Sequence, residues 1–380
     1  MPVMATERSK TALVLTGGGI MGAAYEIGTL AALDRLFARG FSARRFNIYL
    51  GISAGSVIAT LMANRIPADG LFSAISSNQR SVFNWQRHHI YQPDWRALFR
   101  ALGELPRKLL QVRRNYRQNR WIFNPRDLPH LLLEQFPAGI FSLDPMQRYL
   151  CRAFSSEGVC DDFTRLKSEL YIPAYDLDRG ERVVFGMPGL RDMHICQAIT
   201  ASCAIPLFFR PYEIAGNSYI DGSAGLVSHL DIVIERGARL IVLVNPRVPF
   251  DNGPERACLP ALSSGHCSKV ADLGALFAWE QSRRIESREN LRLTLDHCRQ
   301  KYPEIDIVVI EPGSDEALLF FQGPMSSLAR TQVMHHGYQL TLTELRANYQ
   351  DYAGIFARHG IATTPARLAD EPPGVPAATG

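Results

Sequence analysis

The sequence has no uninterrupted apolar run of the ~18 residues that a membrane-spanning helix requires. Its first apolar stretch, residues 11–33, is similar at first sight to the apolar region of a signal peptide. It contains three consecutive glycines and Glu26, however, and it includes a candidate site loop, so cleavage is not expected. We therefore expect a cytoplasmic protein that is at most peripheral at the membrane.

Cysteine is scarce and the net charge is small. The seven cysteines are an odd number without the spacing of a disulfide framework, which indicates a reducing compartment. Cys258, His266 and Cys267 lie close together, but no fourth zinc ligand accompanies them, so no metal site is expected. The net charge is +4 and no nucleic-acid-binding motif accompanies the basic residues, which argues against nucleic acid as a partner.

The most informative motif is Gly51-Ile52-Ser53-Ala54-Gly55. The apolar residues before it predict a strand and the residues after it predict a helix, so Ser53 falls at the tip of a sharp strand-to-helix turn. The two glycines leave room for that turn, and the free amides at the start of the helix point to the same place. The turn is typical of an exposed nucleophilic hydroxyl. A serine that only caps the helix is the alternative.

A second glycine-rich turn lies upstream. Residues 11–16 predict a strand and residues 23–30 predict a helix, with the glycines of residues 17–22 between them. The resulting βαβα order favours a parallel sheet with both turns at its carboxyl edge. Residues 17–22 also fit the G-x-G-x-x-G nucleotide fingerprint, but the second strand ends without the acidic residue that holds a ribose. Amides that stabilise an oxyanion are the favoured interpretation, and nucleotide binding is the weaker alternative.

Asp221 is the best candidate base for Ser53. Residues 211–220 predict a β-hairpin that leads into this aspartate, and a carboxylate at a strand end can accept the serine proton directly. An ordinary Asp-Gly turn is the alternative. None of the ten histidines lies in a comparable loop, although His229 comes closest. Ser53 also follows only two predicted strands, fewer than in the α/β-hydrolase order.

These motifs resemble, in order, the signatures of the patatin-like phospholipase family. The signatures are a glycine loop (residues 17–22), a serine turn (residues 51–55) and an aspartate turn (residues 221–223). Residues 201–206, Ala-Ser-Cys-Ala-Ile-Pro, are similar to the segment that precedes the family's aspartate. The resemblance covers about residues 11–245. It implies a three-layer α/β/α patatin-like fold with a mainly parallel central sheet.

The resemblance also implies a serine–aspartate dyad that needs no histidine. Ser53 would be the nucleophile and Asp221 the general base in hydrolysis of a lipid acyl ester through an acyl-enzyme, with no metal or organic cofactor. The partner would be a lipid or phospholipid ester substrate. The oxyanion hole would be formed by backbone amides of Gly17, Gly18, Gly19 and Ala54. The other motif glycines are Gly22, Gly51, Gly55 and Gly222.

Three positions depart from the family pattern. Met21 stands where the glycine loop usually has a basic residue, and Ser223 stands where the aspartate turn usually has alanine or glycine. Residues 228–230, Ser-His-Leu, stand where an asparagine and a proline often follow. These departures bear on substrate preference more than on the dyad.

Residues 80–126 predict a basic amphipathic insertion. They contain eleven Arg and Lys residues against two acidic ones. Trp95, Phe99 and several leucines fall at helical spacing, up to Pro106, which we expect to break or kink the helix. A basic helix with tryptophan is typical of contact with a membrane surface. A cap that packs its apolar face on the core is the alternative.

The chain is 46% hydrophobic, enough for one large α/β core. We expect residues 11–245 to form the catalytic region and residues 246–350 to extend the same domain. Residues 361–380, rich in proline and alanine, are expected to be disordered. Two rival functions stay open: a catalytically silent relative that binds membrane through residues 80–126, and a nucleotide-binding protein that uses residues 17–22.

Overall fold

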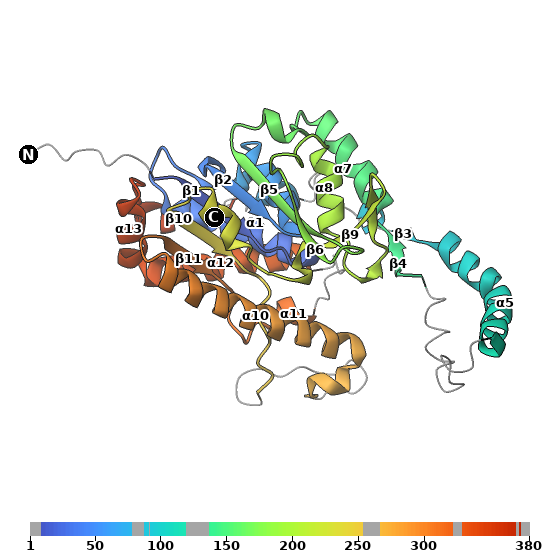
Figure 1. Cartoon of the computed structure of the whole chain (residues 1–380). Coiled ribbons are helices and arrows are strands. Elements are labelled where there is room, and N and C mark those ends of the chain that lie inside the picture. The colour runs from blue at the N-terminus through green and yellow to red at the C-terminus, as the bar shows by residue number, and fades with distance from the viewer. Residues whose placement is uncertain are drawn as a thin grey trace, which may run out of the picture.

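The computed structural model describes residues 9–77, 87–90, 92–118, 137–253, 267–321, 329–369 and 372–373. The predicted insertion is therefore described only in part, because residues 80–86 and 119–126 lie outside these ranges, and so do residues 374–380 of the predicted tail. The described residues form a mixed α/β fold around a central sheet (Figure 1).

The central sheet has eight strands, and its strand order is β11-β10-β1-β2-β5-β9-β8 with β6 also paired to β5. The strands β11, β10, β1, β2 and β5 are mutually parallel, whereas β6, β8 and β9 form an antiparallel edge, so the predicted mainly parallel sheet is confirmed. The bounds are β1 (Thr11–Leu15), β2 (Ile48–Gly51), β5 (Glu169–Asp176), β6 (Glu181–Phe185), β8 (Tyr212–Ile214), β9 (Asn217–Asp221), β10 (Leu240–Val244) and β11 (Asp306–Ile310).

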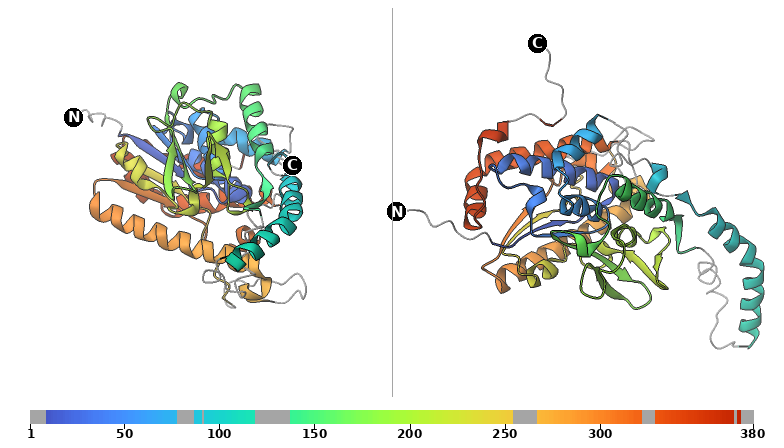
Figure 2. Two further views of the ribbon diagram at one scale, coloured as in Figure 1. Left: turned by 45° about the vertical axis from the view of Figure 1, so that its right-hand side comes forward. Right: turned by 90° about the horizontal axis from the view of Figure 1, so that it is seen from above.

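Helices cover both faces of this sheet, which gives the expected three layers (Figure 2). One face packs against α1 (Gly19–Leu36), α2 (Ala54–Ala63), α3 (Ala68–Ser76), α7 (Asp144–Ser156), α8 (Ile195–Ser202) and α12 (Arg330–Ala347). The other face packs against α9 (Leu230–Glu235) and α10 (Ala275–Lys301). The remaining helices outside these two groups include α4 (Arg87–Ile90), α11 (Ala317–Phe321) and α13 (Tyr349–Arg358).

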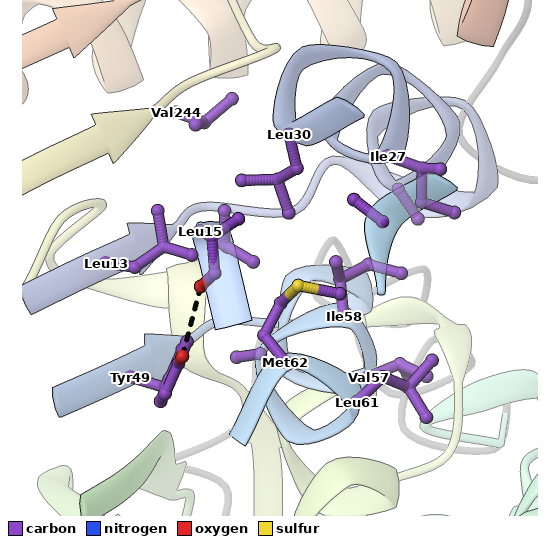
Figure 3. Packing of buried hydrophobic residues seen from close by; sticks show 14 of the residues in the cluster. Leu13, Leu15, Ile27, Leu30, Tyr49, Val57, Ile58, Leu61, Met62 and Val244 are labelled. Atoms are coloured by element: carbon purple, nitrogen blue, oxygen red, sulfur yellow. Dashed lines mark hydrogen bonds between the residues drawn. The ribbon is translucent and has the colours of Figure 1, made fainter. Parts of the chain in front are cut away.

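The central strands are apolar on both faces because both faces are buried. Leu13 and Leu15 of β1 point into the cluster with α1 and α12, while Ala12 and Val14 point into the cluster with α9 and α10. All four side chains are fully buried. Figure 3 shows the first of these clusters, in which Leu13 and Leu15 lie near Leu30 of α1. Continuous apolar strands are what a parallel sheet between helix layers requires.

The first and twelfth helices pack backbone against backbone. A Cβ atom on Gly28 of α1 would lie 2.0 Å from the carbonyl oxygen of Met334, and one on Gly337 of α12 would lie 2.9 Å from the carbonyl oxygen of Tyr25. Each helix therefore needs a glycine where it crosses the other. This crossing fixes α1, and α1 begins at the glycine loop.

A long basic helix stands away from this core. The helix α5 (Trp95–Gln118) follows β3 (Gln92–Pro93), which pairs with β4 (Gly139–Ser142) and through it with β7 (Leu207–Phe209). The views in Figures 1 and 2 agree that α5 projects from the molecule. Of the break or kink expected at Pro106, the break is wrong, because α5 continues through this proline. Within the described parts of the chain, no helix is both long enough and apolar enough to cross a bilayer.

Two expectations need correction. Cys151 of α7 and Cys196 of α8 form a disulfide, with sulfur atoms 2.01 Å apart, so the expectation of reduced cysteines is wrong for this pair. The beginning of the predicted disordered tail is packed on the core. Ile361 and Leu368 are buried, and the amide of Ala38 donates to the carbonyl oxygen of Ala362 at 3.0 Å. These two apolar side chains, on either side of Pro365, hold the segment in place.

The close crossing of α1 and α12 predicts opposite effects for two glycine-to-alanine substitutions. Gly28→Ala is expected to lower the free energy of unfolding by about 1–3 kcal/mol, because the new methyl group clashes with the backbone of α12. Gly354→Ala in α13, where a Cβ atom meets nothing within 4 Å, is expected to raise it by about 0.5–1 kcal/mol. Urea denaturation measures both. Equal effects would contradict the described crossing.

Candidate active site

Ser53 lies at a strained turn between β2 and α2. Its backbone has φ 52° and ψ −129°, a conformation that serine rarely adopts, and its side chain is 5% exposed. Strain of this kind persists only where the surrounding structure holds it in place. The amide of Ser53 donates to the Ser202 hydroxyl oxygen at 2.9 Å, and the Ser56 hydroxyl donates to the carbonyl oxygen of Ser53. The predicted strand–turn–helix is therefore confirmed.

The flanking glycines are required by close packing. A Cβ atom on Gly51 would lie 2.4 Å from the Cα atom of Ser56, and one on Gly55 would lie 2.5 Å from the carbonyl oxygen of Leu15. The unusual φ belongs to Ser53 itself and to neither of these glycines. The sequence-based reason for the glycines, relief of crowding, is thus the correct one.

The glycine loop lies directly against the serine turn. Gly17, Gly18 and Gly19 all have positive φ, at 74°, 111° and 71°, which L side chains rarely adopt. A Cβ atom on Gly17 would lie 2.9 Å from the Gly55 amide nitrogen, and one on Gly22 would lie 2.2 Å from the carbonyl oxygen of Gly17. The two turns that the sequence placed at one edge of the sheet therefore touch through their backbones.

The loop and the helix starts leave amides free for an oxyanion. Among the hydrogen bonds of the described residues, none uses the amides of Gly18, Gly19 or Ala54. Gly19 and Ala54 are the first residues of α1 and α2, where helix amides lack partners and favour negative charge. Gly17 differs from expectation, because its amide donates to the Glu26 carboxyl oxygen Oε1 at 2.7 Å and is not available.

Glu26 is a functional residue that the sequence did not reveal. It is fully buried in α1, and burial raises the pKa of its carboxyl group to about 8, although the Gly17 amide opposes this shift. Its second oxygen has no hydrogen-bond partner in the described structure. Glu26 is therefore protonated at neutral pH, and it anchors the first residue of the glycine loop without adding charge to the site.

Asp221 reaches the site because β9 runs antiparallel to its neighbour. The strand β5 extends past the end of β2, and Asp221 pairs with Ala174 in this extension. The amide of Asp221 donates to the carbonyl oxygen of Ala204 at 2.9 Å, which fixes the strand end. A Cβ atom on Gly222 would lie 2.4 Å from the carbonyl oxygen of Pro173, so glycine is required after the aspartate.

The Asp221 carboxyl group is buried, and only one of its two oxygens has a hydrogen-bond partner among the described residues. Oδ1 accepts a hydrogen bond from the Ser223 amide at 2.8 Å, and Oδ2 has no hydrogen-bond partner among the described residues. Burial raises the pKa of Asp221, while the nearby Ser53 hydroxyl, the Ser223 amide and the charge of Arg247 lower it. A carboxylate with a raised pKa and a free oxygen beside a hydroxyl is suited to act as a base.

Two further residues position the site and were not assigned from the sequence. Ser202, at the end of α8, binds the Ser53 amide and lies against Gly222, so it contacts both turns. His229 is buried, and its Nε2 lies 2.9 Å from the carbonyl oxygen of Gly222. Burial lowers the pKa of His229 to about 4, so the ring is neutral and donates this bond from Nε2–H. His229 thus supports the aspartate turn, and it does not line the Ser53 pocket.

Two cavities meet at Ser53. The first, of about 250 Å³, contains Ser53, Asp221, Gly18 and Gly19 and is also lined by Arg247 and Trp279. The second is almost wholly apolar and shares Ser53 and Gly19 with the first; its other lining residues include Val57, Met146, Leu150 and Phe209. The first cavity has charged side chains in its wall and the second is almost wholly apolar, so the Ser53 hydroxyl between them suits a substrate with both polar and apolar parts.

The chain is similar to one known protein family and to several solved structures. The family model described as patatin-like phospholipase matches residues 13–231, which is more than half of the chain. VipD from Legionella pneumophila aligns at 16% identity over 90% of this chain and 67% of its own, with a TM-score of 0.37. The type III effector protein ExoU aligns at 17% identity over 96% of this chain and 54% of its own, with a TM-score of 0.36, so this chain spans about half its length. No curated protein sequence matches the chain.

The buried Glu26 predicts a pH-dependent penalty on stability. Its pKa is about 8 in the folded state against 4.5 ordinarily, so the folded state holds an extra proton and stability falls as pH rises between these values. Glu26→Gln keeps an oxygen for the Gly17 amide and cannot ionise. We expect its free energy of unfolding to exceed that of the wild type by about 2–4 kcal/mol more at pH 8 than at pH 4.5.

Urea denaturation of both proteins across this pH range measures the difference. A difference that does not change with pH would show that Glu26 has an ordinary pKa. Subtracting the two profiles removes the contributions of other buried carboxyl groups.

Proposed function

The chain belongs to the patatin-like phospholipase family, and from this premise we propose that it hydrolyses acyl esters of lipids with a dyad of Ser53 and Asp221. The observation that carries the proposal is that both side chains line one cavity with Gly18 and Gly19, two of the three residues whose amides are unused. The nucleophile is held at a strained turn, and the carboxyl group beside it has one unpartnered oxygen.

The first half of the reaction forms an acyl-enzyme. The Ser53 oxygen bonds to the ester carbonyl carbon while its proton passes to Oδ2 of Asp221. The carbonyl oxygen becomes an oxyanion, which the amides of Gly18, Gly19 and Ala54 stabilise. The bond to the leaving alcohol then breaks, and the alcohol takes the proton from Asp221.

The second half repeats these steps with water. A water molecule attacks the acyl carbon and gives its proton to Asp221. The bond between the acyl carbon and the Ser53 oxygen breaks, the fatty acid leaves, and the proton returns to Ser53. No further group is needed to balance the reaction. The apolar cavity beside Ser53 is suited to hold the acyl chain, and the cavity with charged side chains in its wall is suited to hold the alcohol part of the ester.

We also propose that α5, within the insertion of residues 80–126, contacts the lipid surface that supplies the substrate. At 100° per residue, Trp95, Phe99 and Leu110 fall within about 60° of one another on this helix. Their side chains are 58%, 67% and 65% exposed. An apolar stripe left open to solvent favours contact with lipid over the alternative of a cap packed on the core.

Charge supports the same role for α5. The helix contains seven Arg or Lys residues and one acidic residue, a net charge of +6, against +4 for the whole chain. The rest of the chain therefore carries −2. Arg100, Arg107 and Arg114 are exposed and lie seven residues apart, within about 40° of one another and beside the apolar stripe. An anionic lipid surface complements this arrangement.

The dyad predicts that two substitutions abolish activity. Ser53→Ala and Asp221→Asn are each expected to lower kcat by at least about 10³-fold, because one removes the nucleophile and the other removes its base. Hydrolysis of a panel of fatty-acyl esters measures turnover, and a fluorophosphonate probe measures covalent reaction at serine. Ser73→Ala, on the remote helix α3, is the matched control and should leave both unchanged.

A folded wild type that neither reacts with the probe nor hydrolyses any ester would contradict the proposal. If that protein still bound liposomes, the catalytically silent relative would be favoured. Tight binding of a nucleotide would favour the glycine loop as a nucleotide site.

The α5 surface predicts selective binding to anionic vesicles. Replacing Arg100, Arg107 and Arg114 with glutamine is expected to weaken binding roughly tenfold to hundredfold, because each basic residue near an anionic surface contributes about 1 kcal/mol. Flotation with phosphatidylserine-containing vesicles measures the change. The control replaces three exposed arginines elsewhere, Arg179, Arg292 and Arg299, which removes the same charge. Equal binding to neutral and anionic vesicles, or equal losses in both variants, would contradict the role of α5.

A further inference from the structure

The loop after β10 is a third element that contacts the glycine loop. It begins with Asn245, which is fully buried. The Thr16 hydroxyl donates to Asn245 Oδ1 at 3.0 Å, and the Arg247 amide donates to the same oxygen at 3.2 Å. Asn245 therefore joins the end of β1, where the glycine loop starts, to the segment that carries Arg247.

Arg247 packs directly over the glycine loop. A Cβ atom on Gly18 would lie 2.9 Å from the Cγ atom and 3.3 Å from the Cδ atom of Arg247. The side chain lines the same cavity as Ser53 and Asp221, and it is 15% exposed. Its aliphatic part thus lies on Gly18, whose amide is free for an oxyanion, and the side chain forms part of the wall of the reaction cavity.

Arg247 forms a long ion pair with a glutamate that a second arginine also binds. Its Nη2 lies 3.7 Å from Oε2 of Glu280 on α10. The other oxygen of Glu280 is bound by Nε of Arg284 at 2.9 Å, so this carboxylate already has a closer cation. Two arginines therefore share one glutamate, and positive charge remains beside the glycine loop.

The glycine loop has no positive charge of its own. Met21 occupies the position where a basic residue usually stands in such loops, and its side chain is 2% exposed and packed in the hydrophobic core. A side chain that points into the core cannot carry charge to the oxyanion. Any cation for this loop has to come from a different element.

We infer that Arg247 supplies this cation and is a catalytic residue that stabilises the oxyanion formed on the substrate of Ser53. The inference rests on the proposed function and adds a residue to it. The guanidinium group acts on the negative charge that develops on the carbonyl oxygen, together with the amides of Gly18, Gly19 and Ala54. A fixed cation in a half-enclosed cavity stabilises such charge more than it does in water.

The surroundings of the Asp221 carboxyl group agree with a positive charge of Arg247 near the dyad. Ser53 faces the carboxyl group from the serine turn, Cys203 from the end of α8 and Ser223 from its own turn. The charge of Arg247 lowers the pKa of Asp221. Glu280 and Arg283 of α10 line the same cavity. Removing Arg247 should therefore also raise the pH at which Asp221 loses its proton.

The test compares Arg247→Gln and Arg247→Lys with the wild type on a neutral acyl ester. We expect Arg247→Gln to lower kcat about 10–100-fold with KM changed less than about threefold, because the charge acts in the transition state. Arg247→Lys should recover part of the loss. The acid limb of kcat/KM should move to higher pH in Arg247→Gln. Arg239→Gln, an exposed arginine just before β10, is the matched control and should behave as the wild type.

Thermal unfolding separates a catalytic effect from a loss of stability. A large loss of stability is not expected, because Glu280 still forms its ion pair with Arg284 when Arg247 is replaced. Unchanged kcat in Arg247→Gln, a loss confined to KM, or an unshifted acid limb would overturn the inference while leaving the proposed function intact. A lysine variant as slow as the glutamine variant, with both unfolding at a lower temperature, would also overturn it, because the role would then be structural. A folded wild type without turnover or labelling by the fluorophosphonate would overturn the proposed function, and this inference with it.

Discussion

The contact between the backbone of Gly17 and that of Gly55 is the constraint on which the site depends. These residues belong to different turns, yet a single methyl group on either would meet the other within 3 Å. The contact exists because β1 and β2 are parallel neighbours, so their ends lie side by side. It sets the amides of the glycine loop against the serine turn without any side chain between them. Residues 17–19 and Ser53, which have positive φ, lie in the two turns that this contact joins.

Burial shapes the electrostatics around this contact. Glu26 and Asp221 are both buried carboxyl groups whose pKa is raised, but their surroundings differ. The carboxyl group of Glu26 accepts a hydrogen bond from the Gly17 amide, and its raised pKa of about 8 favours the neutral, protonated form at pH 7. Asp221 meets a hydroxyl, an amide and the charge of Arg247, all of which favour its ionised form. Two residues of similar chemistry therefore take different roles because of their neighbours.

The parts of the site that the sequence predicted are those with a local signature. Glycines around Ser53, a strand before it and a helix after it describe one short segment, as does the hairpin that ends at Asp221. Ser202, His229 and Arg247 carry no such signature, because each meets its partner only through contacts between distant segments. The disulfide of Cys151 and Cys196 was missed for the same reason, since 45 residues separate the two cysteines. The break expected at Pro106 is absent because an interior proline removes one backbone donor and can bend a helix without ending it.

The separation of charge between α5 and the rest of the chain has a consequence before any contact is made. A body of net −2 that carries a +6 helix on one side is an electric dipole, and an anionic surface exerts a torque on it. The molecule then turns this helix toward the surface over a distance of about one Debye length, near 8 Å at physiological ionic strength. The helix α5 is therefore oriented toward the surface before contact is made. Added salt screens this electrostatic interaction and slows association with the surface.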